Sequence, residues 1–237
     1  MKRVVLSGAI AAASLVFSLP AMAQNTSSVF GPTVKGDENT IEYRLSITPE
    51  SDAVRHRLSY SRALNNSAKV DIKAYWRDRG TGDTDYEKIE GNLLLQVTPD
   101  GNSWQSGIRL GATIRDDGPQ SYGFGWTNQF ALNEDWSLRA IALASIEAGD
   151  NAERNFQLQS RASLTRKLGN GMKTGVELFD RYGVVADDLS FNEQQHTVGP
   201  FLSIPLGADW DIYTGAQIGV SDAASDLDLR FRISHDL

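Results

Sequence analysis

The chain contains no cysteine among its 237 residues. Neither a disulfide framework nor a lipid-modified cysteine anchor is therefore expected. Beyond its first residues the chain also lacks any run of about 18 consecutive apolar residues, which a membrane-spanning helix would need. Histidine is scarce, with three residues in total, so few side chains are available for metal binding or for acid–base chemistry near neutral pH.

The chain also has no excess of positive charge, because 23 basic residues are outnumbered by 30 acidic ones and the formal net charge is −7. An acidic chain is a poor partner for the phosphate backbone, so no nucleic-acid binding is expected. Hydrophobic residues make up only 41% of the chain. This share does not exclude a membrane protein, because a β-barrel wall needs an apolar side chain only at every second position.

The first residues have the three parts of a secretory signal peptide. Lys2 and Arg3 are followed by a mostly apolar stretch and then by the small-residue cleavage site Ala21-Met22-Ala23. We therefore predict a cleaved signal peptide over residues 1–23 and export through the inner membrane. Residues 24–38 are polar and predict a flexible periplasmic lead-in, too short for a plug. Residues 39–237 are predicted to form the barrel itself.

Alternation of apolar and polar residues dominates the rest of the chain, most clearly in the final stretch from Leu227 to Leu237. This period of two is typical of a strand with one face toward hydrocarbon and the other toward water. Such runs cover residues 41–47, 54–60, 70–76, 89–97, 104–114, 122–132, 136–146, 156–168, 172–182, 198–206, 210–220 and 227–237. The run at 136–146 is the least regular, because Ile141 and Leu143 place apolar residues on its second face.

Twelve runs predict an all-β fold, an antiparallel up-and-down transmembrane β-barrel in the outer membrane of a Gram-negative cell. The connections after even-numbered runs are short and rich in turn residues, whereas those after odd-numbered runs are mostly longer, as periplasmic turns and external loops should be. Trp104, Trp136 and Trp210 each follow a short turn, which predicts an aromatic girdle at one interface. Strand Leu227 to Leu237 is expected to engage the barrel-assembly machinery, and the wall to contact outer-membrane lipid and lipopolysaccharide.

The opposite parity of the strands would line the interior, and it carries more basic than acidic residues. These side chains could attract small anionic solutes in an open pore, or pair with acidic neighbours and close it. Glycines on this parity leave room inside or relieve barrel curvature, and residues 183–195 could fold inward as a constriction. The predicted selectivity surface comprises Arg44, Arg55, Arg57, Lys73, Arg109, Arg139, Arg161, Arg230 and Arg232.

Three short stretches carry a resemblance to a known group of channels. They are Ile41-Glu42-Tyr43-Arg44, Arg55-His56-Arg57-Leu58-Ser59 and Lys73-Ala74-Tyr75-Trp76. Together with the signal peptide, the length and the strand number, they resemble the oligogalacturonate-specific porin family of small monomeric channels. The resemblance implies passage of acidic oligosaccharides and a basic lumen at Arg44, Arg55, Arg57 and Lys73. The chain departs from the usual pattern by ending in Leu237 rather than in an aromatic residue, and by its acidic external loops.

An enzyme is not expected. Outer-membrane phospholipase and lipid A deacylase barrels place a serine two positions after a histidine, so that the imidazole can activate the hydroxyl. Here His56, His196 and His235 are followed at that spacing by leucine or valine, and they have no carboxylates at metal-ligand spacing. No cofactor or metal is therefore predicted. Two alternatives to a channel remain: a closed structural or adhesion barrel working through its acidic loops, and a secreted soluble β domain.

Overall fold

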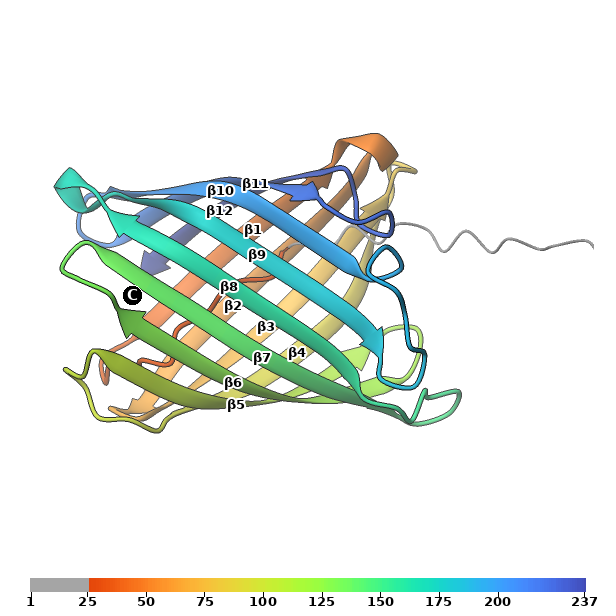
Figure 1. The fold of residues 1–237 in the computed structure, drawn as a ribbon, viewed down its shortest axis with the longest axis horizontal. Helices are drawn as coiled ribbons and strands as arrows, with labels where there is room; N and C mark the ends of the chain where they lie inside the picture. The colour runs from red at the N-terminus through yellow and green to blue at the C-terminus, as the bar shows by residue number, and fades with distance from the viewer. Residues whose placement is uncertain (1–25) are drawn as a thin grey trace, which may run out of the picture.

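A computed structural model describes residues 26–237, so the predicted signal peptide at residues 1–23 lies outside the described residues. The described chain forms twelve antiparallel strands in one closed barrel, with each strand beside its sequence neighbours (Figure 1). The strands are β1 (Asn39–Thr48), β2 (Ala53–Asn65), β3 (Ala68–Arg79), β4 (Thr84–Gln96), β5 (Trp104–Arg115), β6 (Gln120–Ala131), β7 (Trp136–Ala148), β8 (Gln157–Lys167), β9 (Lys173–Val184), β10 (Gln195–Leu206), β11 (Trp210–Gly219) and β12 (Leu227–Asp236). Short 3₁₀ turns, η1 (Pro49–Ser51) and η2 (Gly169–Gly171), complete the elements.

The first and last strands close the barrel. β1 pairs antiparallel with β12 in a register that runs from Thr40 opposite Asp236 to Ile47 opposite Leu229. Closure leaves no sheet edge, so every strand has a hydrogen-bonding neighbour on both sides. This arrangement satisfies the backbone within lipid, where water cannot do so. Within residues 26–237 no helix has the length and hydropathy needed to cross a membrane.

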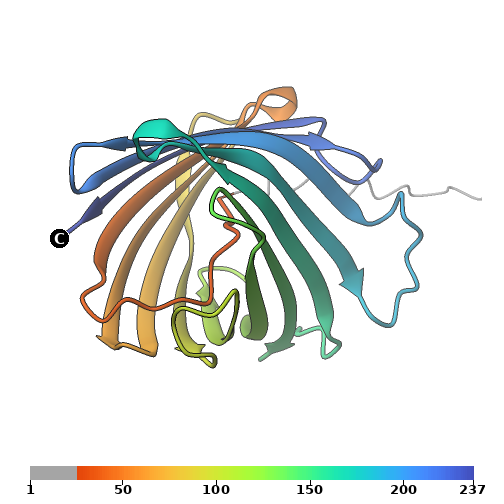
Figure 2. The ribbon, with the colours of Figure 1, turned by 60° about the vertical axis from the view of Figure 1, so that its left-hand side comes forward.

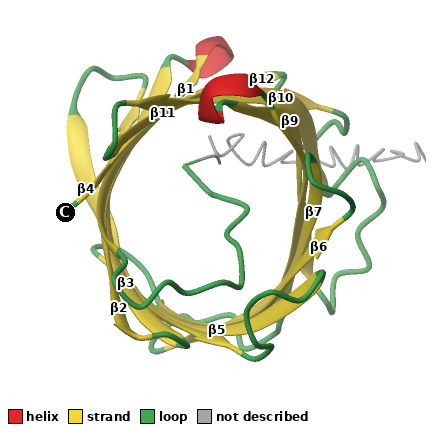
Figure 3. Cartoon of the chain, turned by 90° about the vertical axis from the view of Figure 1, so that its left-hand side faces the viewer, coloured by secondary structure: helices red, strands yellow, loops and turns green. Residues whose placement is uncertain are grey.

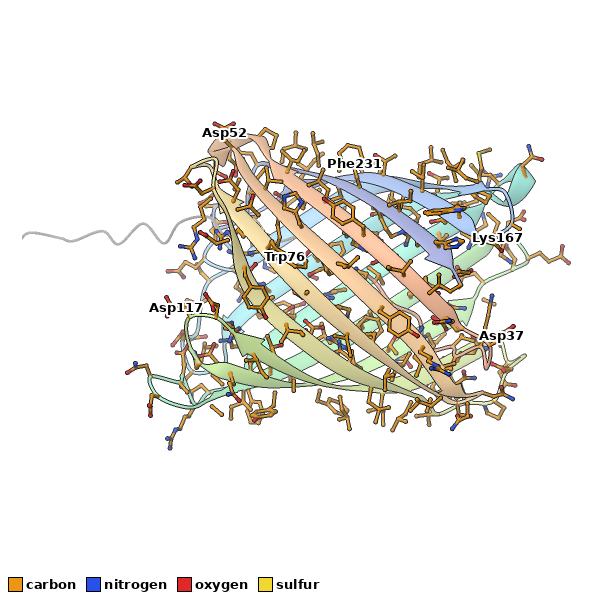
Figure 4. All side chains as sticks on the ribbon, turned by 180° about the vertical axis from the view of Figure 1, so that it is seen from behind. Asp37, Asp52, Trp76, Asp117, Lys167 and Phe231 are labelled. Atoms are coloured by element: carbon orange, nitrogen blue, oxygen red, sulfur yellow. The ribbon has the colours of Figure 1, made fainter. Side chains whose placement is uncertain are left out.

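The alternating pattern places apolar side chains on the outer wall, as expected. Leu110, Phe124 and Ile218 are each about half exposed in the isolated chain, whereas their inward neighbours are largely covered. Figure 4 shows side chains projecting from the wall, with Phe231 on β12, while Asp52 and Asp117 mark one rim and Asp37 and Lys167 mark the other. An apolar outer face on a closed barrel is the arrangement of an outer-membrane protein. The soluble-domain alternative is therefore wrong.

The three tryptophans that follow short turns lie on the outer wall at the rim that also carries the C-terminus. Trp104, Trp136 and Trp210 begin β5, β7 and β11. The indole of Trp210 stacks on His235 with ring centroids 4.3 Å apart, and the Arg166 guanidinium lies 5.6 Å from the Trp136 ring. We call this end the turn rim and the opposite end the loop rim.

The strands reach further into the connections than the sequence predicts, so the sorting of loops by length is weaker than expected. Connections at residues 80–83 and 116–119 are tight although they follow odd-numbered strands, and the turn at 97–103 is longer than either. One cause of the tighter connections is seen at the end of β3, where the carboxylate of Asp78 accepts hydrogen bonds from the backbone N–H groups of residues 80–82. Only residues 149–156, 185–194 and 220–226 form long loops at the loop rim.

The loop at residues 185–194 lies against the outside of the barrel, not in the bore. Phe191 stacks on His196, which lies on the outward parity of β10, with centroids 4.3 Å apart and ring planes at 6°. The backbone N–H of Ala223 donates to the Asn192 carbonyl at 3.0 Å, joining this loop to the next one. Figure 2 shows the segment, in light blue, beyond the strands. It is therefore not the inward constriction that the sequence left open.

The described part of the predicted lead-in corrects the sequence-based expectation. Residues 26–36, here called the N-terminal segment, run back from the turn rim into the bore (Figure 3). Val29 packs with Ile141 and Phe179, and Phe30 and Leu143 join this cluster. The inward apolar residues that made the run at 136–146 irregular are thus the docking surface for the segment. Short length does not prevent plugging, because an extended peptide of this size spans the interior.

Candidate functional site: the basic bore

All nine predicted selectivity residues face the interior. Strand register sets several of them side by side, since Arg44 of β1 stands opposite Arg57 of β2 and opposite Arg232 of β12. Arg57 and Arg230 are the most enclosed of the nine, each with 2% of its surface exposed. The interior is therefore a dense array of cations held by the wall.

Many of these cations are neutralised by carboxylates. Glu42 receives the guanidinium of Arg44 at 2.8 Å, pairs with Arg57, and lies 3.8 Å from Arg232. Removing a buried partner from such a cluster leaves a charge without compensation, which is costly. Glu42 thus allows three arginines to stand close together without mutual repulsion dominating.

A second cluster is built on β3, β4 and β5. The ammonium of Lys73 lies 3.0 Å from Asp71 and 3.1 Å from Glu90, and Glu90 also pairs with Arg109. Asn92 bridges the cluster, because its amide donates to both carboxylates and its oxygen accepts from Arg109 at 2.6 Å. These strands are consecutive, so the cluster is local in sequence.

The remaining predicted residues divide into two groups. Arg230 pairs with Glu177 at 2.7 Å, Arg55 with Glu87 at 3.0 Å, and Arg232 also with Asp211. In contrast, Arg139 and Arg161 form no ion pair with a carboxylate of the described chain. Arg139 donates to the Gln129 amide oxygen at 2.6 Å, and Arg161 donates to Gln159 at 3.2 Å.

Four further cavity-lining basic residues share this unpaired state and were missing from the predicted set. Lys88, Lys167, Lys173 and Arg181 form no ion pair within residues 26–237, and Lys88 lies 4.6 Å from the centre of the Tyr75 ring. A sequence signal existed, because cross-strand neighbours on the inner face can be paired once the register is known. Arg181 stands opposite Gln159 and Gln195, so neither of its directly opposite neighbours is a carboxylate.

Two cavities lie in the bore on either side of Ser28. The outer cavity, toward the loop rim, has a volume of about 210 Å³ and is lined by eight basic side chains and by a single carboxylate, Glu90. The inner cavity, toward the turn rim, has a volume of about 280 Å³ and is lined by five basic side chains and by Glu177. After the ion pairs are taken into account, each cavity keeps three basic side chains without a carboxylate partner in the described chain: Lys88, Arg161 and Arg181 in the outer one, and Arg139, Lys167 and Lys173 in the inner one.

The N-terminal segment separates these chambers and takes up much of the hydrogen-bonding capacity of the arginines. Its backbone carbonyls at Thr26, Ser27 and Ser28 accept from Arg57, from Arg44 at 2.9 Å together with Arg230, and from Arg161 at 3.1 Å. Four of the nine predicted residues thus converge on three successive peptide groups. No sequence pattern pointed to this contact.

Glycines of the inner face mostly mark close approaches and not open space. A Cβ at Gly199 would lie 1.6 Å from the Ala216 carbonyl oxygen, and one at Gly175 would lie 2.0 Å from the Leu164 carbonyl oxygen. At Gly123 the nearest atom would be 3.7 Å away, so that position does leave room. Of the two explanations for these glycines, relief of close backbone packing in a curved wall applies to most of them.

The outer wall carries one polar cluster that resembles a hydrolytic site in composition but not in geometry. Asp180 accepts from the Ser160 hydroxyl at 2.8 Å and lies 2.7 Å from Nδ1 of His196. The hydroxyl thus contacts the carboxylate, whereas a nucleophilic serine needs the imidazole as its base. Nε2 of His196 faces the Gln194 amide oxygen at 3.2 Å. Within residues 26–237 no group of three or more metal-ligating side chains is found.

Known proteins resemble this barrel in structure but not in sequence. The sequence matches no protein-family model and no curated protein. Among solved structures, the NanC porin aligns with a TM-score of 0.65 at 12% identity, over 83% of this chain and 100% of that one. The KdgM porin in complex with disordered oligogalacturonate aligns with a TM-score of 0.61 at 12% identity, over 84% and 99%. This chain has the porin fold. The resemblance to these porins, predicted from three short stretches, holds for the fold of the whole barrel.

Proposed function

We propose that this porin-fold barrel is an outer-membrane channel for passive diffusion of small hydrophilic anionic solutes, such as acidic oligosaccharides. The observation that supports the proposal is the lining of the outer cavity, where three of the eight basic side chains, Lys88, Arg161 and Arg181, form no ion pair with a carboxylate of the described chain. A water-filled chamber of one charge sign concentrates ions of the opposite sign and excludes the others. The chain is acidic as a whole, whereas the side chains that line its bore are mainly basic.

Selectivity rests on the cavity-lining cations that have no carboxylate partner in the described chain: Lys88, Arg139, Arg161, Lys167, Lys173 and Arg181. The paired residues of the predicted set, among them Arg55, Arg57 and Lys73, contribute a hydrogen-bonding surface with less net charge. Guanidinium groups suit carboxylate-bearing solutes, because they can donate two parallel hydrogen bonds to one carboxylate. The barrel acts without a reaction, as a monomer, and its last strand remains the expected contact for the assembly machinery.

Liposome swelling tests this function. Proteoliposomes holding the full-length mature protein are diluted into iso-osmotic glucose or potassium glucuronate, which have organic solutes of similar size and different charge. Valinomycin is present in both, so that K⁺ crosses the membrane independently of the barrel and balances the charge of the entering glucuronate. We expect faster entry of glucuronate than of glucose, and loss of this preference in a Lys88→Gln, Arg161→Gln, Arg181→Gln variant. Equal entry of both solutes in the native protein would contradict anion preference.

The ion pairs and the docked N-terminal segment favour a second candidate, a closed structural barrel. In that case, proteoliposomes would swell no faster with the protein than without it, for either solute. A plugged bore and a paired interior are sufficient for a stable wall with no transport, so this result would replace the channel.

A further inference from the structure

The N-terminal segment is held in the bore by contacts along its whole length. It leaves β1 at the turn rim through a tight turn, in which the Glu38 N–H donates to the Lys35 carbonyl at 2.9 Å. Glu38 is fixed to Lys69 of β3 by an ion pair at 2.6 Å. The turn therefore directs the preceding residues back into the barrel.

Apolar contacts fix the middle of the segment. Val29 is 6% exposed and packs with Ile141 and Phe179, and the Arg109 guanidinium lies 5.2 Å from the centre of the Phe30 ring. Pro32 fits against β5 where Gly107 has no side chain. A larger residue at Gly107 would occupy the place of the proline ring.

Polar contacts match the backbone of the segment to the wall. The Thr33 hydroxyl donates to Gln105 at 2.8 Å, and the Val34 N–H donates to the Gln96 amide oxygen at 2.7 Å. The Thr127 hydroxyl donates to the Phe30 carbonyl at 3.0 Å. Side chains from β4, β5 and β6 thus form hydrogen bonds that fix the position of the segment along the bore.

The segment has a composition suited to reversible occupation of a cationic site. From Thr26 to Val34 it carries no charged side chain. Its carbonyls accept hydrogen bonds from Arg44, Arg57, Arg161 and Arg230 without adding a negative charge. Of these four arginines, Arg161 alone has no carboxylate partner within residues 26–237, since the others pair with Glu42 or Glu177. A carboxylate offers Arg161 a hydrogen bond in which both partners are ionised, and it can accept two parallel bonds from one guanidinium.

We propose that residues 26–36 are a built-in plug that occupies the arginine section of the bore and is displaced by carboxylate-bearing solutes. The proposal rests on the channel function proposed above. The docked segment divides the bore at Ser28 into the two chambers. Its release around the turn at residues 35–38 joins them into one path. An anionic solute then both opens the channel and takes the place of the peptide carbonyls.

A disulfide lock tests the plug in the intact barrel, because the native chain has no cysteine to interfere. A Cβ at Gly107 would lie 3.1 Å from Cβ of Pro32, whereas disulfide-bonded Cβ atoms are about 3.8 Å apart, so a small shift accommodates the bond in a Pro32→Cys, Gly107→Cys variant. We expect a low conductance in planar bilayers when this variant is oxidised and an increase on reduction. The two single-cysteine variants should not respond to reductant. Equal conductance before and after reduction, with the crosslink verified by mass spectrometry, would overturn the plug while leaving the channel intact.

Two further measurements guard against a lock that distorts the wall. A Val29→Ala, Phe30→Ala variant should lower the ratio of docked to released segment by roughly a hundredfold and raise the open probability. In a Pro32→Cys variant, a maleimide should modify the cysteine faster in citrate than in chloride of equal ionic strength. Equal modification rates in the two salts would refute displacement of the segment by carboxylates. Absence of current in the reduced lock and in the double alanine variant would overturn the channel function and the plug together.

Discussion

Neutralising Arg181 is the sharpest test of the idea that unpaired cations set the selectivity of the bore. The side chain lines the outer cavity, forms no hydrogen bond with the N-terminal segment, and forms no ion pair with a carboxylate of the described chain. An Arg181→Gln substitution therefore removes one positive charge and leaves no acidic partner exposed. The glutamine keeps a polar side chain of moderate length at the same place.

The expected magnitude follows from Coulomb's law. A monovalent anion passing about 4 Å from the guanidinium gains about 1 kcal/mol in water. Since 1.4 kcal/mol corresponds to a factor of ten, loss of the charge should lower the local anion concentration by about fivefold. The Debye length is about 10 Å at 0.1 M salt and about 3 Å at 1 M, so the effect should be clear at the lower concentration and nearly absent at the higher.

Reversal potentials across planar bilayers in a potassium chloride gradient measure this change directly. Arg181→Lys keeps the charge and should keep the native reversal potential. Arg166→Gln is the matched control on β8, because that arginine lies on the outer wall beside Trp136. If Arg181→Gln folds and retains the native reversal potential at 0.1 M salt, the unpaired cations do not control selectivity and the reasoning fails.

Three more predictions follow from the wall and its loops. Leu110→Arg puts a charge on the lipid face of β5 and should lower the free energy of unfolding by about 2–4 kcal/mol in urea titrations, whereas Thr113→Arg, on the inner face of the same strand, should change it far less. Gly199→Ala would bring a Cβ to 1.6 Å from the Ala216 carbonyl oxygen and should abolish the heat-modifiable gel shift of the folded barrel, whereas Gly123→Ala, with 3.7 Å to its nearest atom, should fold; equal folding of both would contradict the close approach. Phe191→Ala removes a ring stack worth about 0.5–1.5 kcal/mol and should raise proteolytic cleavage within residues 185–194 by roughly two- to tenfold. Single-channel conductance should stay unchanged in that variant, and a change would place the loop at the pore.

The wall of the barrel could be predicted from sequence because its physics is local. Alternation at residues 227–237 and in eleven similar runs indicates which side chains face lipid, and strands that cross lipid must close into a barrel to satisfy their backbone hydrogen bonds. The boundaries were less accurate, because strand ends depend on turn chemistry such as the carboxylate of Asp78 capping its own turn. Because such local hydrogen bonds form tight turns, the strands are longer and the loops shorter than the sequence predicted.

The inside of the barrel was harder to predict, because its contacts join residues far apart in sequence. Glu42 and Arg232, or Glu177 and Arg230, meet only after the barrel closes. The inward parity of a cation therefore could not separate paired from unpaired residues, and the nine predicted selectivity residues left out Lys88, Lys173 and Arg181 although these also lie on the inward parity. The N-terminal segment was missed because nothing in its polar sequence marks it as a ligand of the bore. The two inward apolar residues Ile141 and Leu143 were the available clue.

Single-channel recording of the purified mature protein in planar bilayers tests the central claim most directly. An anion-selective channel predicts discrete conductance steps whose reversal potential favours chloride over potassium, with longer openings when the Val29→Ala, Phe30→Ala variant is used. A membrane that shows no steps at any voltage, for the native protein and for that variant alike, would contradict a conducting cationic bore.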